Sequence, residues 1–413
     1  MKRVVVTGMG TISPIGHNVE EFWKNIKAGE IGIDTITQFD ATNTATKIAA
    51  EVKDFKASDY FSGKAARKMA RFTQFAVAAS VEAMNDAGLA EDNFDHQRAG
   101  CILGCGIGGL DVTEDNVKGM VDRGPIAGIA PMTIPKLISN EGPANVSITH
   151  KLHGPCFALA TACASGTDAI GYALNTIRTG MADIMVTGGT EATITEFAVG
   201  SFNKLLALST RNDDPKAACR PFDKDRDGFI MGEGAGILIL EELEHAKKRG
   251  ATIYAELAGY GMTCDADHLT APDPEGKGGA ESMRIAVKDA GLEMEDIDYI
   301  NAHGTSTPVN DPCETLAIKA AFGDHAKKIK ISSTKAMHGH MLGATGGVEA
   351  IVCIKAINDS YVPPTLNLEE PDEKCDLDYV PNKGIEMEVN AALSDNLGFG
   401  GHNGSIVFKK YKG

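Results

Sequence analysis

Cys163 is the residue of this sequence whose surroundings best suit a catalytic nucleophile. It lies within FALATACASGTDAIGYAL, where an apolar run ends, small residues follow and a helical pattern begins. The N-terminal end of a helix carries partial positive charge and unpaired N–H groups, which stabilise a thiolate and can bind an oxyanion. A cysteine in an apolar segment is more often inert packing. The position of Cys163 between a strand and a helix favours instead a reactive thiol with a lowered pKa.

Two histidines offer the partners that such a nucleophile needs. His303 in NAHGTSTP and His340 in AMHGHMLGATGG each follow a predicted strand at its C-terminal end. In a parallel sheet these ends gather on one side, where ligand sites form. Lys335 stands at the same strand end as His340, and Phe399 is the one large side chain of the glycine turn NLGFGGHNG. Each residue alone could be structural, but together they favour shared chemistry.

The elements that must position these residues alternate along the chain. After Cys163, apolar residues recur at helical spacing as far as Ile177, and Gly180 suits the end of that helix. Strands that alternate with helices predict an α/β fold with mostly parallel, buried strands. The two halves also resemble each other, which predicts a duplicated unit divided into residues 1–250 and 251–413 that pack as one body.

Composition limits the classes of function. The 413 residues carry a net charge of −16, which argues against nucleic acid as the main partner. No apolar run approaches the length of a membrane span, and the opening MKRVVVTG predicts a β-strand rather than a secretory signal. The nine cysteines form no C-x-x-C pair, so we expect free thiols in a reducing cytoplasm and no metal site.

Two shorter motifs are interpreted as structural. GCGIGG fits G-x-G-x-x-G through Gly104, Gly106 and Gly109. A dinucleotide fold needs a helix next and then a second strand that ends in an acidic residue roughly 20 positions on. That region is RGPIAGIAP (residues 123–131), which predicts a loop. DKDRDGFIMGEG imitates a calcium loop, but its final position is Gly234 rather than a glutamate. We expect a close-packed glycine turn in the first case and a charged turn in the second.

Four separated motifs, TACASG, NAHGTSTP, STKAMHGHMLGATGG and GFGGHNG, stand in this order along the chain. They resemble the elongating β-ketoacyl-acyl-carrier-protein synthases, with the greatest similarity to the synthase II group, and the resemblance runs from end to end. It implies the thiolase-like fold, in which two pseudo-symmetric βαβαβαββ halves form a five-layered αβαβα body. It also implies a homodimer.

The resemblance implies a decarboxylative condensation that elongates a fatty acyl chain. Cys163 would take an acyl group from acyl carrier protein, and the enolate of malonyl carrier protein would attack that thioester after CO2 leaves. His303 and His340 would stabilise the enolate, and Lys335 would orient them through Glu349. The N–H groups of Cys163 and Phe399 would form the oxyanion hole. No cofactor is expected beyond the phosphopantetheine arm of the carrier.

The resemblance also assigns binding residues. The positions matched to contacts with the pantetheine arm are Thr270, Thr305 and Thr307. The basic positions matched to docking of the acidic carrier, in GKAARKMARF, are Lys64, Arg67 and Lys68. The alternative interpretation of the three threonines is that they are ordinary loop hydroxyls. The alternative interpretation of the three basic residues is that they form a solvated helix face.

Several positions depart from the pattern of the family. His338 and His402 stand where threonine is common, and we expect them to lie in loops near the site. Leu206 stands where a basic carrier contact often occurs, and Lys204 could substitute for it. The segment VNDPCE is also unusual.

Two further functions stay open. A ketosynthase of a polyketide or specialised lipid pathway would share the catalytic residues. A non-catalytic partner subunit would keep the fold, but Cys163 opposes that interpretation. His340 favours elongation, because the priming synthases carry asparagine at that position.

Overall fold

The two halves of the chain fold with the same order of main elements, and the computed structural model describes all residues 1–413. The first half contains β1 (Val4–Ile12), α1 (Val19–Ala28), β2 (Asp34–Thr35), β3 (Ile48–Ala49), α2 (Gly63–Ala66), α3 (Arg71–Asp86), β4 (Ala99–Gly104), α4 (Leu110–Gly128), α5 (Thr133–Leu137), α6 (Glu141–His150), β5 (Cys156–Leu159), α7 (Ser165–Arg178), β6 (Ile184–Glu191), α8 (Glu196–Lys204), β7 (Gly234–Glu242) and α9 (Leu243–Lys248). The second half contains β8 (Ala255–Cys264), α10 (Lys277–Asp289), β9 (Tyr299–Asn301), α11 (Asn310–Phe322), β10 (Lys330–Ser332), α12 (Lys335–His338), α13 (Thr345–Asp359), β11 (Tyr361–Val362), β12 (Ile385–Glu386), β13 (Ala391–Gly398) and β14 (His402–Lys409).

The sheet shows the duplication directly. The strands of the first half lie in the order β1-β7-β6-β4-β5, and those of the second half lie in the corresponding order β8-β14-β13-β9-β10. In each half the three strands at the outer edge are parallel. β1 pairs with β8 only through Val5–Glu256 and Val6–Ala255, so hydrogen bonds join the two five-stranded halves into one continuous sheet. The predicted pair of βαβαβαββ units is therefore confirmed, and we propose residue 250, between β7 and β8, as their boundary.

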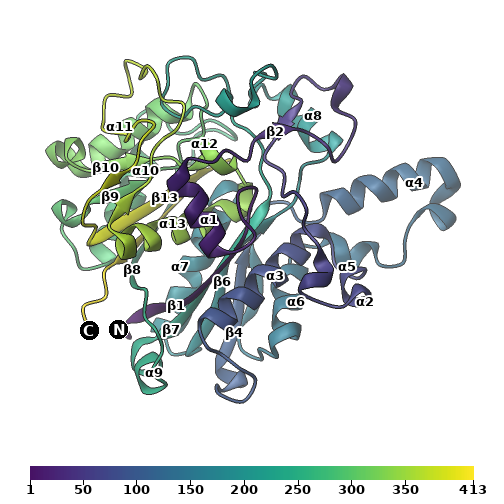
Figure 1. Ribbon diagram of the computed structural model, residues 1–413, viewed down its shortest axis with the longest axis horizontal. Helices are drawn as coiled ribbons and strands as arrows, with labels where there is room; N and C mark the ends of the chain where they lie inside the picture. Colours follow the sequence, from purple (N-terminus) through teal and green to yellow (C-terminus); the bar gives the residue numbers. More distant parts are fainter.

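Helices cover the sheet in layers (Figure 1). α7 and α13 pack against each other and against strands of both halves, while α3 covers the outer face of the first half and α10 that of the second. α13 is apolar on nearly all sides, as expected for a helix buried in the middle of a protein. A Cβ atom on Gly347 of α13 would lie 2.2 Å from the Gly236 carbonyl oxygen of β7, so glycine permits this close packing. The resulting order of layers is αβαβα.

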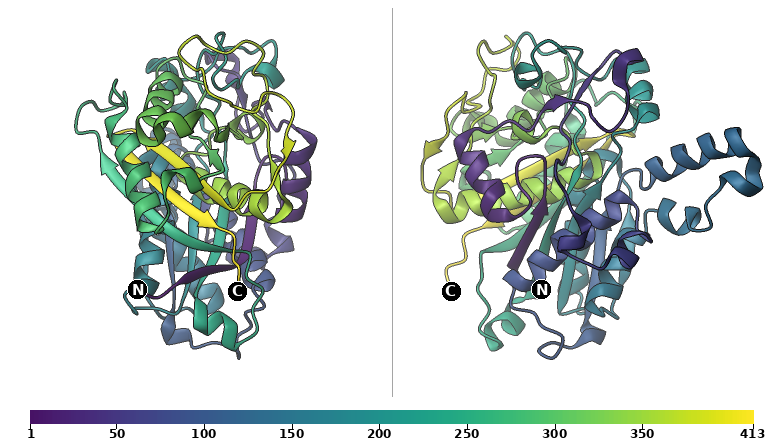
Figure 2. Two further views of the ribbon diagram at one scale, coloured as in Figure 1. Left: turned by 90° about the vertical axis from the view of Figure 1, so that its left-hand side faces the viewer. Right: turned by 45° about the vertical axis from the view of Figure 1, so that its right-hand side comes forward.

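An arm made of α4 and α5 projects from this body (Figure 2). The loop predicted for residues 123–131 is wrong over most of its length, because α4 continues to Gly128 with a break at Gly124, where φ is 77°. Pro125 follows the break and fits the first turn of the resumed helix. None of the helices combines the length and the apolar composition that crossing a bilayer requires.

The glycine turn GCGIGG serves the protein's own structure. The N–H groups of Gly106, Ile107 and Gly108 donate to the buried carboxylate of Glu191 over 2.8, 3.3 and 3.2 Å. A Cβ atom on Gly104 would lie 2.2 Å from the backbone of Ser165, at the start of α7. These donors therefore hold a side chain of the same protein, and the turn allows α7 to lie close to β4.

The segment DKDRDGFIMGEG is likewise committed to internal contacts. Asp223 accepts hydrogen bonds from Arg220 and from the backbone of Asp225, Glu369 and Glu370. Its carboxylate therefore closes a charged turn, as predicted, and the turn leads toward β7.

Candidate active site

Cys163 lies in a strained turn between β5 and α7. The strand ends at Leu159, and Cys163 is the middle residue of the 3₁₀ helix Ala162–Ala164, which precedes α7. Ala162 has a φ of 51°, a left-handed conformation that costs an alanine on the order of 1 kcal/mol. The turn directs the sulfur into the protein, where Cys163 is only 9% exposed.

The second half contains the equivalent turn without a sulfur. The 3₁₀ helix Leu342–Ala344 precedes α13, and Leu342 has a φ of 46°. Gly343 therefore occupies the position that corresponds to Cys163, and its carbonyl oxygen would lie 2.9 Å from a Cβ atom on Gly166 of α7. Because the two turns meet at the middle of the molecule, His340, which precedes the second turn, faces the sulfur of the first.

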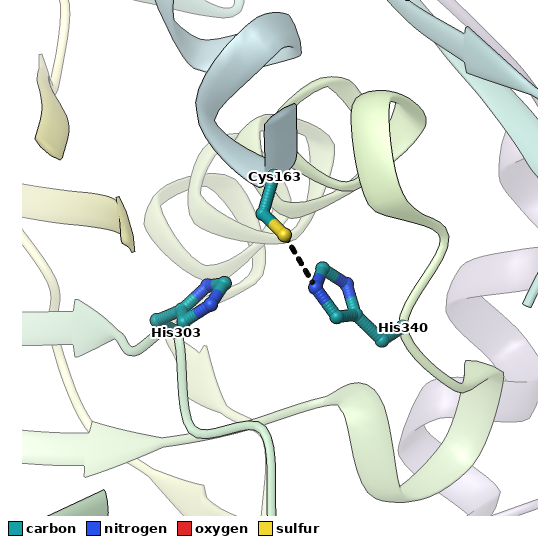
Figure 3. Close-up of side chains that lie close together, drawn as sticks. All are labelled: Cys163, His303 and His340. Atoms are coloured by element: carbon teal, nitrogen blue, oxygen red, sulfur yellow. Dashed lines mark hydrogen bonds between the residues drawn. The ribbon is translucent and has the colours of Figure 1, made fainter. Parts of the chain in front are cut away.

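The structure brings the three predicted catalytic residues together (Figure 3). The Cys163 sulfur and nitrogens of His303 and His340 lie within 4.8 Å of one another. The Nε2 atom of His340 is 3.0 Å from Cys163 Sγ, and the two imidazole rings lie nearly perpendicular with centroids 5.3 Å apart. All three side chains are buried.

The protonation state of Cys163 differs from the thiolate that the sequence favours. Burial raises the pKa of the Cys163 thiol to about 11, although the charge of Lys335 and the N–H groups of Phe399 and Cys163 act in the opposite direction. The predicted lowered pKa is therefore wrong, because the loss of hydration outweighs the helix end. Burial, and then the charge of Lys335, holds the pKa of His303 and of His340 well below the ordinary value. At neutral pH the site contains a thiol and two neutral imidazoles.

Alkylation of Cys163 tests this protonation state. Because the thiolate reacts, we expect the rate with iodoacetamide to rise about tenfold per pH unit from pH 7 to roughly pH 10. Quantitative peptide mapping measures the rate, with the exposed Cys264 of the same digest as a reference for reagent activity. A rate for Cys163 that levels off near pH 7 would contradict the assignment.

A buried network of an ion pair and hydrogen bonds supports the His303 side chain. Lys335 pairs with Glu349 Oε1, and Glu349 Oε2 accepts a hydrogen bond of 2.7 Å from Asn396 Nδ2. The same amide nitrogen lies 3.4 Å from His303 Nδ1. Lys335 does not line the cavity, so we expect it to act on the histidines through Glu349, as an orienting group, rather than by touching a substrate. Sequence reasoning missed Asn396, although its place two residues before the GFGG turn was a usable signal.

A cavity of about 450 Å³ opens beside these residues and is lined by a majority of hydrophobic side chains. The three threonines predicted to bind the pantetheine arm all line it, and the Oγ1 atoms of Thr305 and Thr307 lie 3.0 Å apart. Asp265 and Asn403 line the cavity too, and sequence reasoning missed both. The cavity offers apolar space for a chain and hydroxyls for a polar arm.

The turn that carries Phe399 lies against the nucleophile. The N–H groups of Phe399 and Cys163 lie near enough to the sulfur to lower the pKa of its thiol, which is where an oxyanion hole requires its donors. A Cβ atom on Gly398 would lie 2.7 Å from the Thr161 carbonyl oxygen and 3.2 Å from the Cys163 nitrogen. Only glycine therefore leaves room beside these donors.

The two unusual histidines have different locations. His338 is buried in α12, where Nε2 pairs with Thr334 Oγ1 and Nδ1 with the Gly339 carbonyl oxygen. It ends a helix rather than lying in the expected loop, and it is near the site but does not line the cavity. His402 begins β14, and its ring would lie 3.1 Å from a Cβ atom on Gly400 of the GFGG turn.

The predicted docking residues lie on the surface. Lys64, Arg67 and Lys68 are exposed, but α2 ends at Ala66 and does not continue into α3. Arg71, which stands at helical spacing from them, instead pairs with the buried Glu233. The basic patch is therefore a short helix followed by a turn.

The catalytic cluster is also a donor set that a metal ion could use. The sequence shows no metal-ligand spacing for this donor set, because the three residues come from distant segments. The Sγ–Nε2 distance of 3.0 Å is that of a hydrogen bond, whereas zinc bonds of about 2.3 and 2.0 Å at a tetrahedral angle separate such atoms by about 3.5 Å. The geometry thus fits a hydrogen-bonded catalytic set better than a zinc site.

A duplicated αβαβα body with a cysteine and two histidines where its halves meet defines a thiolase-like condensing enzyme. The N-terminal domain of β-ketoacyl synthases matches residues 1–246, and the C-terminal domain matches residues 254–369. The chain belongs to the β-ketoacyl synthase family, which confirms the predicted relationship.

Relatives and solved structures agree with this membership. The chain is 51% identical to the 3-oxoacyl-[acyl-carrier-protein] synthase 2 of Synechocystis, and equally to that of Staphylococcus aureus, over 100% of its own length and 99% of theirs. A ketosynthase solved in complex with its type II polyketide acyl carrier protein is 36% identical, with a TM-score of 0.93 and full coverage of both chains.

Proposed function

We propose that the protein elongates fatty acyl chains by two carbons through decarboxylative condensation. The observation that carries the proposal is the thiol of Cys163 within 4.8 Å of two neutral imidazoles, beside a largely apolar cavity. The relatives named 3-oxoacyl-[acyl-carrier-protein] synthase 2 support it. The polyketide ketosynthase is less similar, at 36% identity, so a fatty acyl substrate is favoured over a polyketide.

The first step loads the enzyme. Cys163 Sγ attacks the carbonyl carbon of an acyl thioester, and the sulfur of the carrier leaves. His340 Nε2, 3.0 Å from Sγ, accepts the thiol proton and passes it to the departing sulfur. The N–H groups of Cys163 and Phe399 stabilise the oxyanion. This step consumes no net proton.

The second step forms the carbon–carbon bond. The malonyl group loses CO2, and the electron pair of the broken bond forms an enolate whose oxygen accepts hydrogen bonds from His303 and His340. Acylated sulfur donates no proton, so the Nε2–H tautomer of His340 is then favoured. The enolate carbon attacks the acyl carbon, and Cys163 leaves as a thiolate. Because its pKa is about 11, the thiolate takes up one proton per turnover at neutral pH.

The carrier supplies both substrates on its phosphopantetheine arm, and we propose that no other cofactor takes part. Thr270, Thr305 and Thr307 line the cavity through which that arm would reach Cys163. The solved ketosynthase–carrier complex supports an acyl carrier protein as the partner. The carrier would dock on the exposed patch of Lys64, Arg67 and Lys68. The apolar Leu206, which is 88% exposed, lines the cavity instead.

Charge reversal tests the docking surface. Changing Lys64, Arg67 and Lys68 to glutamate should raise KM for malonyl carrier protein about tenfold to hundredfold, because three attractive contacts become repulsive. The kcat should change much less, and the effect should shrink with added salt. Reversal of Lys247, Lys248 and Lys288, which are exposed elsewhere, is the matched control. Equal effects of the two triple variants would exclude a specific patch.

We propose that the protein forms a homodimer in which a second copy of the chain covers the α4–α5 arm and the edge of the sheet. β5 is the last strand of the sheet, and Cys156 and Phe157 on it are exposed. The arm carries the exposed apolar side chains Val121, Ile126 and Ile134. Free strand edges and clustered apolar side chains favour association, which supports a homodimer. The nine free cysteines support a cytoplasmic location.

A direct assay tests the function. The enzyme is incubated with malonyl carrier protein and a series of saturated acyl carrier proteins, and the products are followed by mass spectrometry. We expect release of CO2 and a β-ketoacyl carrier protein two carbons longer, with ping-pong kinetics. Reaction with polyketide intermediates but not with saturated chains would favour the alternative pathway.

A further inference from the structure

Asp168 is a buried carboxylate that the proposed reaction does not use. It lies in the first turn of α7 and is 1% exposed. Its Oδ2 atom accepts a hydrogen bond of 2.6 Å from the hydroxyl of Thr161, and its Oδ1 atom accepts one of 2.8 Å from the hydroxyl of Tyr260. Burial raises the pKa of Asp168, and the two hydroxyls act in the opposite direction. Thr161 and Tyr260 thus form a carboxylate anchor with Asp168, in which they stabilise a charge that the interior disfavours.

Thr161 connects this anchor to the turn that carries the nucleophile. It has φ −131° and ψ 44°, and the next residue, Ala162, has a φ of 51°. Both residues before Cys163 therefore depart from regular strand and helix conformations. Hydrogen bonds also hold the Thr161 backbone, because its N–H donates to Ser165 Oγ over 2.9 Å and its carbonyl oxygen accepts from the Ala164 N–H over 3.1 Å. The side chain of Thr161 adds a third attachment to this strained turn.

The second half of the protein makes the same turn without a carboxylate. In both halves a 3₁₀ helix of three residues leads directly into a longer helix, which is α7 or α13. Thr161 corresponds to Met341 and Asp168 to Val348, and both apolar residues are buried in one hydrophobic cluster. The turn therefore forms without a polar anchor. Because a buried carboxylate opposes folding, its presence only beside the nucleophile indicates a role in the reaction.

The second half of the protein fixes the position of the carboxylate. Tyr260 lies on β8, and its ring packs over Gly171 of α7, where a Cβ atom would lie 2.4 Å from the ring. A Cβ atom on Gly404 of β14 would lie 2.7 Å from Asp168 Oδ1. Glycine at both positions leaves the space that the ring and the carboxylate occupy. The position of Asp168 is thus set by β8 and β14 as well as by its own helix.

We propose that Asp168 is a positioning residue that fixes the Cys163 turn through Thr161. The sulfur and the N–H of Cys163 then meet the carbonyl group of the acyl thioester in the reactive geometry. This role in acyl transfer rests on the proposed function. Neither Asp168 nor Thr161 lines the cavity, so the carboxylate acts through the turn and does not touch the substrate.

The test separates the two half-reactions. Asp168→Leu removes both hydrogen bonds but keeps a side chain of similar size. A displaced nucleophile should lower the single-turnover rate of Cys163 acylation by about 10²-fold, while malonyl decarboxylation should change by less than about threefold. Decarboxylation is spared because it uses His303 and His340. Destabilisation of the whole fold would instead lower both rates together, and Tm measures that effect separately.

Conservative variants and a control complete the test. The side-chain amide of Asp168→Asn can accept from one hydroxyl and donate to the other, so acylation should return to within about tenfold of the wild type. Thr161→Val removes one hydroxyl and carries the prediction of Asp168→Leu, should that variant not fold. Tyr260→Phe should also slow acylation. Tyr379→Phe is its matched control, because this buried hydroxyl bonds to Thr315 instead, and it should load like the wild type.

Two results would overturn the proposal. One is a folded Asp168→Leu that is acylated at the wild-type rate, and the other is an equal loss of acylation and decarboxylation in that variant.

Alkylation distinguishes failure of the anchor from failure of the proposed function. If the wild type takes no acyl group from a carrier protein, the proposed function fails, but iodoacetamide still reports the position of Cys163. Asp168→Leu should then be alkylated several-fold faster than the wild type, because a loosened turn exposes the buried sulfur, and Asp168→Asn should match the wild type. Equal alkylation rates in all three proteins would contradict the anchor.

Discussion

Replacing Cys163 with alanine is expected to lower the rate of condensation by about 10⁴-fold or more, because the acyl group then has no nucleophile to hold it. Release of CO2 from malonyl carrier protein should persist to a measurable extent, since His303 and His340 remain. Single-turnover assays that follow acyl transfer and CO2 separately distinguish the two steps. The variant removes a buried thiol and should change Tm only modestly.

Cys219→Ala is the matched control for this variant. Cys219 is also a buried thiol, but it does not line the cavity. Its replacement should leave acyl transfer at the level of the wild type. Comparable losses in the two variants would mean that packing, and not nucleophilic chemistry, explains the effect at Cys163.

Alanine at His303 or at His340 is expected to slow malonyl decarboxylation by about 10²–10³-fold each, because each replacement removes one hydrogen-bond donor to the enolate oxygen. The two variants should differ in acylation. His340 Nε2 is 3.0 Å from the sulfur, so His340→Ala should also slow loading of Cys163. His303→Ala should load nearly normally. Stopped assays of acyl-enzyme formation and of CO2 release measure the two steps.

His338→Asn provides the comparison for these variants. His338 is buried two residues before His340, but its ring bonds only to Thr334 and Gly339. We expect this variant to retain decarboxylation even where its Tm falls. Unchanged CO2 release in both His303→Ala and His340→Ala would remove the role assigned to these imidazoles.

Much of the site could be predicted because its residues lie at strand ends. In an α/β fold the ends of parallel strands converge, so His303 after β9 and His340 after β10 were recognisable together with Cys163. The duplication was also visible, since the segments around β5 and β10 resemble each other. What the sequence could not supply was the magnitude of burial. The pKa of Cys163 is raised because desolvation outweighs the helix end, and only the packed structure shows that balance.

Contacts between distant segments are the second kind of feature that could not be predicted from the sequence. Asn396 links Glu349 to His303, but this contact has no periodic pattern in the sequence. Lys335 lies outside the cavity, and its pair with Glu349 fits the orienting role expected of it. The helix through residues 123–128 was missed because glycine and proline usually favour loops, whereas here Gly124 breaks α4 and Pro125 restarts it.

The mass of the intact protein after incubation with an acyl carrier protein tests the central claim most directly. We predict a gain of one acyl group per chain, which peptide mapping places on Cys163 and which subsequent addition of malonyl carrier protein removes. A wild-type protein that gains no acyl group, or that carries it on a residue other than Cys163, would contradict the account.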